Sequence, residues 1–264
     1  MRILNFLFSR SKQEQDKPIR DKLKTRKDFE RVLAEDLDIM ETTKARMDTA
    51  KNINLYMYRS LSYSYILILQ SKYSVDAKID ELRDIYIKSM YYFLQAFNKR
   101  NPIYADILNY VSLGVLLNIP DENFRQLIDY VKQMDKQAKP SGWTPDLLLW
   151  FMLNSRLKEQ EKLKYAETLA YPRLYNGLYK VIQAPNAAAA KDALNEYLDR
   201  WYNLNSDAPW YNSHLKDNCY RGYWAWEVAA VAKIMHIDDS DLKNNQYYPY
   251  DMVHWADNET TAKE

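Results

Sequence analysis

Glycine is scarce in this chain, and its scarcity limits the folds that the sequence can adopt. Tight β-hairpins and phosphate-binding loops depend on glycine, because a residue without a Cβ adopts positive φ angles freely and lets the backbone approach a ligand closely. The nucleotide-binding patterns G-x-x-x-x-G-K and G-x-G-x-x-G are absent as well. The sequence therefore argues against a β-rich fold and against a phosphate-cradling loop. Its 264 residues contain only four glycines, Gly114, Gly142, Gly177 and Gly222.

Apolar residues recur at intervals of three and four along almost the whole chain, and this spacing places them on one face of an α-helix. A run of four alanines at residues 187–190 also favours helix. No run of alternating Ile and Val is long enough to indicate a strand. We therefore expect an all-α fold, an antiparallel helical bundle or TPR-like α-α superhelix in two packed halves. The helices are expected at residues 29–50, 55–69, 79–98, 103–117, 121–131, 147–153, 163–169, 187–202 and 220–236.

Prolines mark several expected boundaries. Asn101 can cap a helix that has Pro102 at its first position, and Pro172 is expected to end the helix at residues 163–169. Between residues 136 and 145, two prolines, a glycine and a serine interrupt the periodic segments. We place a domain junction there. It gives an N-terminal helical domain at residues 18–138 and a C-terminal helical domain at residues 143–256.

The single cysteine, Cys219, indicates a reducing compartment, because paired cysteines are typical of oxidising ones. We interpret its thiol as core filling at the start of an aromatic helix rather than as a nucleophile. The apolar run at residues 3–8 is too short for a signal peptide or a membrane span. We expect a cytoplasmic protein without a membrane partner. A weak amphipathic membrane contact by Phe6, Leu7 and Phe8 is the alternative to a frayed terminus.

Charge is distributed unevenly along the chain, although the formal net charge is only +1. Residues 181–264 contain thirteen acidic and seven basic side chains, so this part carries −6 and the preceding part carries +7. Residues 1–31 contain ten basic and five acidic side chains. A basic arm can contact nucleic acid, but a charge excess of this kind is more often a solvated surface.

The aromatic segment at residues 209–255 contains the candidate catalytic residue Glu227. A helix at residues 220–236 would place Glu227 among tyrosines and tryptophans, where an unpaired carboxylate is costly and must find donors. The candidate donors, besides the tyrosine hydroxyls, are His214, Arg221, Trp224 and Trp226.

Two interpretations of Glu227 follow from this setting. In the functional interpretation, Glu227 and His214 form an acid–base pair that Asp238 and Asp239 assist. In the structural interpretation, Glu227 belongs to a satisfied polar network that fixes the helix register. Because no nucleophile or metal motif accompanies the pair, we favour the structural interpretation and expect no enzyme.

Metal-binding spacing is also missing from this segment. The three histidines, at positions 214, 236 and 254, are twenty-two and eighteen residues apart, whereas a helical metal site uses residues three or four apart. The acidic residues at positions 238, 239 and 241 lack the glycine and the alternating ligands of a calcium loop. We interpret residues 237–240 as a helix stop followed by an N-cap, and residues 247–251 as an extended tail whose tyrosines pack on the core. We expect no metal and no cofactor.

Three motifs in this segment resemble the C-terminal domain of the PoNi family of immunity proteins: residues 220–227 (YRGYWAWE), 237–240 (IDDS) and 247–251 (YYPYD). Residues 19–29 and the tyrosine-rich helices up to about residue 139 are similar to the N-terminal domain of that family, with looser motifs. The resemblance implies an all-α protein in two parts that has no catalytic activity. It also implies that the protein protects a bacterium by binding a cognate polymorphic nuclease toxin, a DNase delivered by a type VI or related secretion system.

This resemblance makes the acidic C-terminal part the expected toxin-binding surface. A nuclease that grips DNA needs a positively charged groove, so an acidic face can occupy the groove and opposite charges can speed its capture. The partner is then the toxin rather than nucleic acid. We expect the toxin-binding residues to be Glu196, Asp199, Asp207, Asp238, Asp239 and Asp241.

We interpret the signature residues of the three motifs as determinants of the fold. In this interpretation Gly222 lets helices approach, Trp224 and Trp226 fill the core, and Glu227 anchors a polar network. The complete set is Tyr220, Gly222, Tyr223, Trp224, Trp226, Glu227, Tyr248, Pro249 and Asp251.

Two other classes of function stay open from the residues alone. A helical-repeat adaptor for another protein or RNA would need the basic side chains at residues 2–31 to form a continuous groove with exposed aromatics. A small helical hydrolase would need Glu227, His214 and Asp239 to meet in a pocket. Neither has a recognised motif, and the oligomeric state is not indicated by the sequence.

Overall fold

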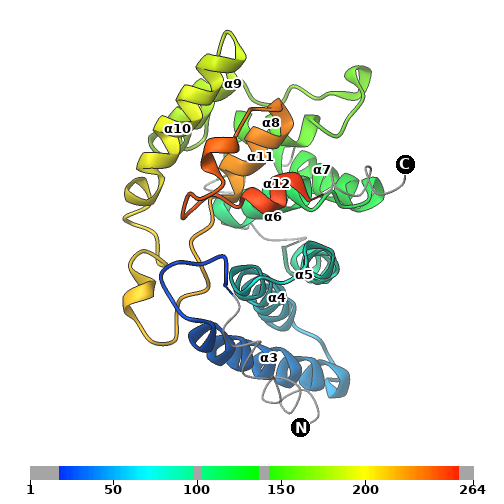
Figure 1. Cartoon of the computed structure of the whole chain (residues 1–264). Helices are drawn as coiled ribbons and strands as arrows, with labels where there is room; N and C mark the ends of the chain where they lie inside the picture. The colour runs from blue at the N-terminus through cyan, green and yellow to red at the C-terminus, as the bar shows by residue number, and fades with distance from the viewer. Residues whose placement is uncertain (1–17, 98–102, 137–142, 256–264) are drawn as a thin grey trace, which may run out of the picture. The chain divides into compact units, whose positions relative to one another are not determined.

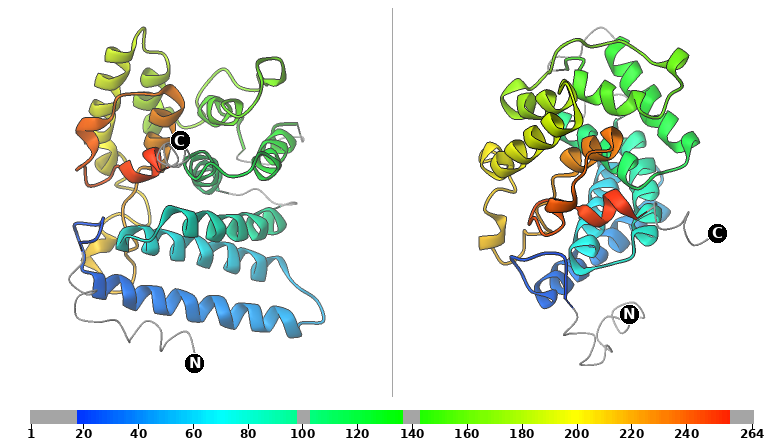
Figure 2. Two further views of the ribbon diagram at one scale, coloured as in Figure 1. Left: turned by 45° about the vertical axis from the view of Figure 1, so that its right-hand side comes forward. Right: turned by 45° about the horizontal axis from the view of Figure 1, so that its top comes forward.

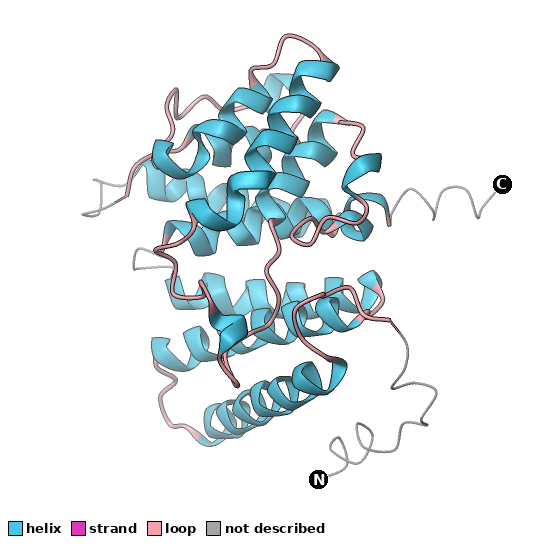
Figure 3. Cartoon of the chain, turned by 60° about the vertical axis from the view of Figure 1, so that its left-hand side comes forward, coloured by secondary structure: helices cyan, strands magenta, loops and turns pink. Residues whose placement is uncertain are grey.

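The computed structural model of the protein describes residues 18–97, 103–136 and 143–255. Helices, turns and loops make up these residues, which include no β-strand (Figure 1 and Figure 3). The expected all-α fold is therefore confirmed for the described part of the chain. The expected cap at Asn101 and Pro102 and the alternative membrane contact at Phe6, Leu7 and Phe8 lie outside the described residues.

The chain forms two compact units, and neither unit is continuous in sequence. Unit 1 comprises Met1–Phe97 and Pro209–Tyr223, and unit 2 comprises Asn98–Ala208 and Trp224–Glu264. The junction expected between residues 138 and 143 lies within unit 2 of this division. A division into two domains at that junction stays a prediction.

The described part of unit 1 contains α3 (Arg26–Thr49), α4 (Leu55–Val75), α5 (Ile79–Phe97) and the short 3-10 helix η2 (Ser213–Leu215). Helix α4 packs against both α3 and α5, and the three lie side by side in Figure 2. Side-chain caps define where two of these helices begin. Thr25 and Asp28 form a reciprocal capping box at α3, and the Asn54 side chain accepts from the N–H of Met57 at α4.

The segment Pro209–Tyr223 is fastened to the rest of unit 1 by buried polar bonds. The Arg221 guanidinium donates to both carboxylate oxygens of Asp36, at 2.9 and 2.8 Å, across 185 residues of sequence. The hydroxyl of Tyr220 donates to Asp21, and the hydroxyl of Ser74 donates to the carbonyl of Arg221 at 2.8 Å. Burial raises the pKa of Asp36, and the guanidinium opposes that rise. Because the carboxylate and the guanidinium satisfy each other through two hydrogen bonds, both tolerate burial.

Helix α11 (Trp226–Met235) forms the centre of unit 2. It packs against α6 (Tyr104–Leu116), α8 (Leu147–Asn154), α9 (Pro172–Ile182), α10 (Ala187–Leu204) and α12 (Tyr250–His254). A helix covered by so many neighbours must be apolar around its circumference, and residues 228–231 (VAAV) are completely buried. The other elements of the unit are α7 (Asp121–Lys136) and the 3-10 helices η1 (Glu159–Glu161) and η3 (Ser240–Leu242).

Two carboxylates join further segments of unit 2, and the first, Asp146, is buried. It caps α8 by accepting from the N–H of Leu149 at 2.9 Å, and it also accepts from the N–H of Ala170 at 2.7 Å and the hydroxyl of Tyr104 at 2.8 Å. Burial raises the pKa of Asp146, while these donors oppose the rise. One side chain thus connects α6, the start of α8 and the loop before α9.

Asp135 near the end of α7 acts in the same way on two tryptophans. The indole N–H of Trp143 donates to one carboxylate oxygen at 2.7 Å, and that of Trp150 donates to the other at 2.6 Å. Burial raises the pKa of Asp135, again against the effect of its donors. Both indoles therefore bury their rings without leaving an N–H unpaired.

Helices α9 and α10 approach closely at Gly177. A Cβ at this position would lie 2.5 Å from Cδ2 of Tyr197, which is too short for any carbon–carbon contact. The Tyr197 hydroxyl donates to the carbonyl of Leu174 at 3.0 Å, which holds the ring against α9. Gly177 is thus required by the close packing of two helices.

The expected helix at residues 220–236 is wrong in its first six residues. Helix α11 begins only at Trp226, and residues 220–225 are not helical. Gly222 has a φ of 107°, a left-handed value that an α-helix excludes. The three-and-four spacing predicted a single helix face, but Tyr220 is buried in unit 1 and Trp226 is buried in unit 2. Two different cores, rather than one helix face, account for these aromatics.

The expected short helix at residues 163–169 is also wrong. Asn154 bonds the backbone N–H and C=O of Leu163 at 2.9 and 2.8 Å, and the carbonyl of Thr168 accepts from the N–H of Leu147 at 3.0 Å. These backbone groups are therefore occupied outside a helix. Pro172 does not end a helix but starts α9, since proline at the first helical position lacks only an N–H that would be unpaired there.

The remaining expected helices are confirmed, and α4 and α7 extend further than expected, to Val75 and Lys136. Helix α6 begins at Tyr104 after Ile103, which makes no side-chain cap bond. In the C-terminal tail Tyr248 is buried as expected, but the extended conformation ends at Tyr250, where α12 begins.

Replacing Arg221 with Met should test the fastening of segment 209–223. The change leaves Asp36 buried without its cation, so we expect unfolding to become easier by about 3–5 kcal/mol, measured by urea denaturation. Adding Asp36→Leu in the same chain should recover much of that loss, because no unpaired charge then remains buried. A single variant as stable as the wild type would contradict the assigned role.

Candidate partner-binding surface on unit 2

The two members of the acid–base pair that the sequence allowed, Glu227 and His214, belong to different units. Glu227 lies at the start of α11 with only 7% of its surface exposed, and its carboxylate accepts from the indole N–H of Trp201 at 2.6 Å. His214 belongs to unit 1, where its Nδ1 lies 3.0 Å from the hydroxyl of Tyr223. Each side chain thus has its own partner in its own unit. The observed geometry supports the structural interpretation of Glu227.

Burial gives Glu227 an unusual pKa. Desolvation raises its pKa from 4.5 to about 7, while its own backbone N–H and the indole of Trp201 act in the opposite direction. No second titratable group is hydrogen-bonded to the carboxylate among the described residues. A raised pKa can mark a catalytic acid, but here it follows from enclosure in the core.

Asp239 differs from the other expected toxin-binding acids because it is buried, with 2% of its surface exposed. It accepts from the hydroxyl of Tyr248 at 2.7 Å and lies 2.8 Å from Nε2 of His254. Its carboxylate therefore connects the η3 turn with the C-terminal tail and is not presented to a partner. The sequence pattern gave no sign of this difference between Asp239 and its neighbours at positions 238 and 241.

Asp238 and Asp241 are exposed and lie together at the start of α10. The ammonium of Lys191 is 2.9 Å from Asp238 and 3.2 Å from Asp241, and the Asn195 amide donates to Asp241 at 3.1 Å. The hydrogen bond from Lys191, followed by that from Ser240, lowers the pKa of Asp238 to about 2. Both carboxylates therefore stay ionised at neutral pH and hold η3 beside α10.

The other expected acids lie on or just after α10. Glu196 is 3.7 Å from Arg200, one helical turn away, and Asp207 is 3.0 Å from Arg173 on α9. Asp199 is exposed and forms no ion pair with the described residues. Exposed pairs of this kind contribute little to stability, so these groups can exchange partners when another protein binds.

Sequence reasoning missed one acid of this surface, Asp192. Residues 192, 196 and 199 follow the spacing i, i+4 and i+7, and all three are exposed along one side of α10. They span about 10 Å at 1.5 Å per residue. Helical spacing within residues 187–202 would have found Asp192. We call the exposed acids of this region the α10 acidic surface; its members are Asp192, Glu196, Asp199, Asp207, Asp238 and Asp241.

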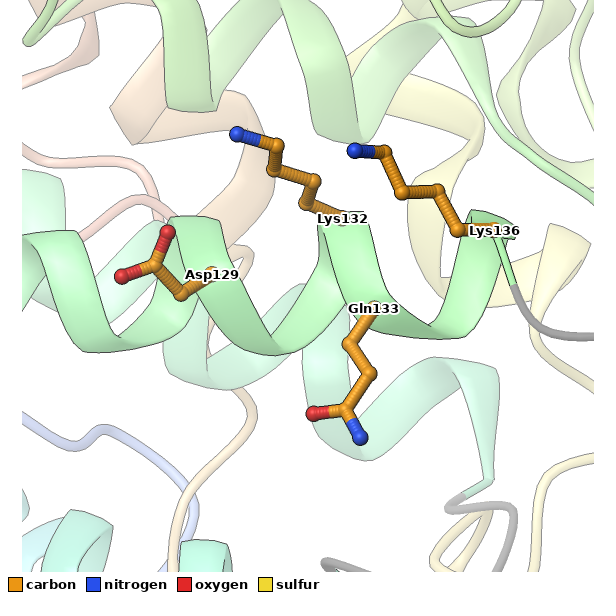
Figure 4. Close-up of a pocket in the computed structure, with 4 residues that line it drawn as sticks. All are labelled: Asp129, Lys132, Gln133 and Lys136. Carbon is orange, nitrogen blue, oxygen red and sulfur yellow. The ribbon is translucent and has the colours of Figure 1, made fainter.

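Two hollows lie on the surface of unit 2. One, of about 310 Å³, lies along α7 and is lined by Asp129, Lys132, Gln133 and Lys136. Figure 4 shows Lys132 and Lys136 extending to one side of the helix and Gln133 to the other. The other, of about 260 Å³, is the groove between α9 and α10. Neither lining contains the nucleophile, base and orienting group that covalent catalysis requires.

Metal ligands and membrane spans can be assessed over the described residues only. There, no three side chains of His, Cys, Asp or Glu gather closely enough to hold a metal ion. None of the described helices is long and apolar enough to cross a membrane. Cys219 is exposed, so its expected role as core filling is wrong.

The signature residues mostly support the fold, although not always as expected. Trp224 and Trp226 are buried with their rings 6.1 Å apart, and Tyr248 is buried as well. Gly222 is needed for its positive φ angle rather than for a close approach of helices. Asp251, in contrast, lies exposed in α12.

These observations define an all-α protein whose candidate site is a charged surface on and beside helix α10. Residues 11–129 match the family described as PoNe immunity protein (PoNi), N-terminal, and residues 144–252 match PoNe immunity proteins (PoNi), C-terminal. The chain belongs to the PoNi family of immunity proteins, and this membership implies immunity to a polymorphic nuclease toxin.

A solved structure also shares the fold. Protein PA2201 from Pseudomonas aeruginosa superposes with a TM-score of 0.69 and 19% sequence identity, over 93% of this chain and 93% of that chain. At this identity the likeness concerns the fold alone. No curated protein gives a significant sequence match to the chain.

The raised pKa of Glu227 predicts a specific pH dependence of stability. Between pH 4.5 and about pH 7 the unfolded state is ionised at this residue and the folded state keeps its proton, so stability should fall as pH rises through this window. The full contribution is about 3 kcal/mol. Glu227→Gln should remove that decline in urea titrations at pH 4.5 and pH 8. The exposed control Glu41→Gln should keep it, and an unchanged decline in the Glu227→Gln variant would refute the assignment.

Proposed function

We propose that the protein is an immunity protein without turnover that binds one molecule of a DNase toxin and covers its DNA-binding cleft. Membership of the PoNi family over residues 11–252 carries this proposal. The toxin would be one delivered by a type VI or related secretion system. The protein would act in the cytoplasm, where such a toxin meets DNA.

The α10 acidic surface suits this role physically. A DNase cleft must attract phosphates, so it presents lysine and arginine side chains over the width of a duplex. Carboxylates at positions 192, 196 and 199 offer a row of negative charge over about 10 Å of rigid helix. Because α10 is an 18-residue helix packed on α9, this row keeps its spacing before binding, which lowers the ordering cost.

Electrostatic attraction also suits a protein that must capture its toxin quickly. Each toxin molecule that escapes capture can cut the genome, and opposite charges raise association rates above those of neutral surfaces. The exposed acids at positions 192 and 199 are suited to this task, because neither forms an ion pair with the described residues.

Reversing two charges of α10 should therefore slow capture without unfolding the protein. We expect the double variant Asp192→Lys and Asp199→Lys to bind the cognate nuclease domain at least about tenfold more slowly than the wild type at low salt. Surface plasmon resonance at about 20 to 500 mM NaCl measures both the rate and its salt dependence, because screening of exposed charges changes strongly over this range.

The matched control carries Asp38→Lys and Glu41→Lys on exposed positions of α3, which changes the net charge equally. It should associate with the nuclease domain nearly as fast as the wild type. Failure of wild-type protein to protect cells that express the cognate nuclease toxin would contradict the proposed function. An association rate that does not change with salt would contradict the claim that opposite charges speed the capture of the toxin.

A further inference from the structure

The groove between α9 and α10 is continuous along one face of each helix. It is lined on α9 by Arg173, Asn176, Gly177 and Lys180, and on α10 by Ala193, Glu196, Tyr197 and Arg200, together with Pro172, Leu174 and Leu204. On both helices the lining follows the spacing i, i+3 or i+4, and i+7, so the two walls run about 10 Å side by side. This length suits three residues of extended chain at about 3.3 Å each.

The bottom of the groove is apolar and firmly built. Gly177 lets α9 approach the ring of Tyr197, and the hydroxyl of that tyrosine is bonded to the carbonyl of Leu174 at 3.0 Å. Ala193 has only a methyl group, so it leaves space between the walls. A partner side chain can therefore bury apolar surface here without first rearranging either helix.

Cations dominate the rim of the groove. Arg173, Lys180 and Arg200 are exposed, and Glu196 is the single acidic residue in the lining. Lys180 forms no ion pair with the described residues. Arg173 and Lys180 lie seven residues apart on one face of α9, so positive charge is available along the length of the groove.

The ion pairs already present at the rim are easily exchanged. Arg173 pairs with Asp207 at 3.0 Å, with side chains 65% and 78% exposed, and Arg200 lies 3.7 Å from Glu196. Exposed pairs contribute little to stability because water screens both charges. A partner carboxylate that excludes water from the groove can therefore replace Asp207 or Glu196 at little cost.

We propose that this groove receives a short extended acidic segment of the toxin, with one apolar side chain on Tyr197 and carboxylates on Arg200 and Lys180. The proposal rests on the proposed function. A metal-dependent nuclease cleft carries carboxylates for its metal ions beside cations for the phosphates. The acidic row of α10, at positions 192, 196 and 199, can face the nuclease cations. The cationic groove beside it can face the nuclease carboxylates.

A nucleic acid fits the groove less well than an acidic protein segment. The floor at Gly177, Ala193 and Tyr197 is apolar and suits an aliphatic side chain, which a sugar–phosphate backbone does not carry.

Two variants of the full chain test the groove separately by charge and by shape. Lys180→Glu with Arg200→Glu reverses the rim, and Ala193→Phe fills the space above the floor while leaving every charge in place. The control Lys132→Glu with Lys136→Glu makes the same change of charge at the α7 hollow. Isothermal titration calorimetry against the purified nuclease domain of the cognate toxin gives Kd, and thermal unfolding confirms that each variant folds.

Both groove variants should weaken binding about tenfold or more, and the α7 control should stay within about threefold of the wild type. Lysine substitutions of the nuclease domain's acidic residues should include one that restores binding to the rim-reversed variant. Unchanged affinity of both groove variants, with a tightly binding wild type, overturns the groove and leaves the proposed function standing. A wild type that does not bind the nuclease domain overturns both. If the wild type binds a short fluorescent DNA duplex and the rim-reversed variant does not, the occupant is nucleic acid and the proposal is overturned.

Discussion

Buried and half-buried carboxylates that accept hydrogen bonds from aromatic side chains hold much of this structure together. A phenol or indole contributes a large apolar body to the core and a single donor at its edge, so one residue both fills space and satisfies an acid. This explains why a chain with 23 tyrosines and 7 tryptophans can bury so many acids. The pairs are Asp21 with Tyr220, Asp135 with Trp143 and Trp150, Asp146 with Tyr104, Glu227 with Trp201, and Asp239 with Tyr248.

The same pairing marks the limit of what the sequence could predict. Three-and-four spacing correctly predicted most helices, because it reports the face that each helix buries. It misplaced the start of α11, since Tyr220 and Trp226 satisfy the spacing but are buried in different units. It also missed α9, whose first residue, Pro172, was expected to be a terminator. Spacing identifies buried faces but does not identify the neighbour that covers them.

The candidate surface was predicted less completely than the fold. Five of the six acids that were expected to bind the toxin are exposed, and their role in binding stays a prediction. Asp239 is the exception, because a tyrosine nine residues further along the chain bonds its carboxylate in the core. Composition cannot distinguish a carboxylate with a buried donor from one in water. The groove between α9 and α10 was equally hidden, since it arises from Gly177 opposite a tyrosine twenty residues away.

The interleaving of the two units along the sequence has a consequence for how such proteins can diversify. Segment Pro209–Tyr223 belongs to unit 1 although it is surrounded in sequence by residues of unit 2. If recombination replaced all residues after 138 with those of another chain, Asp36 and Asp21 would face different residues at positions 221 and 220. Recombination can therefore exchange the two halves only between chains that both keep Arg221 and Tyr220 as partners of Asp36 and Asp21. Substitutions at exposed positions of α10 do not affect these bonds. Sequence differences between such proteins should therefore accumulate as substitutions of exposed side chains more readily than as exchanges of halves.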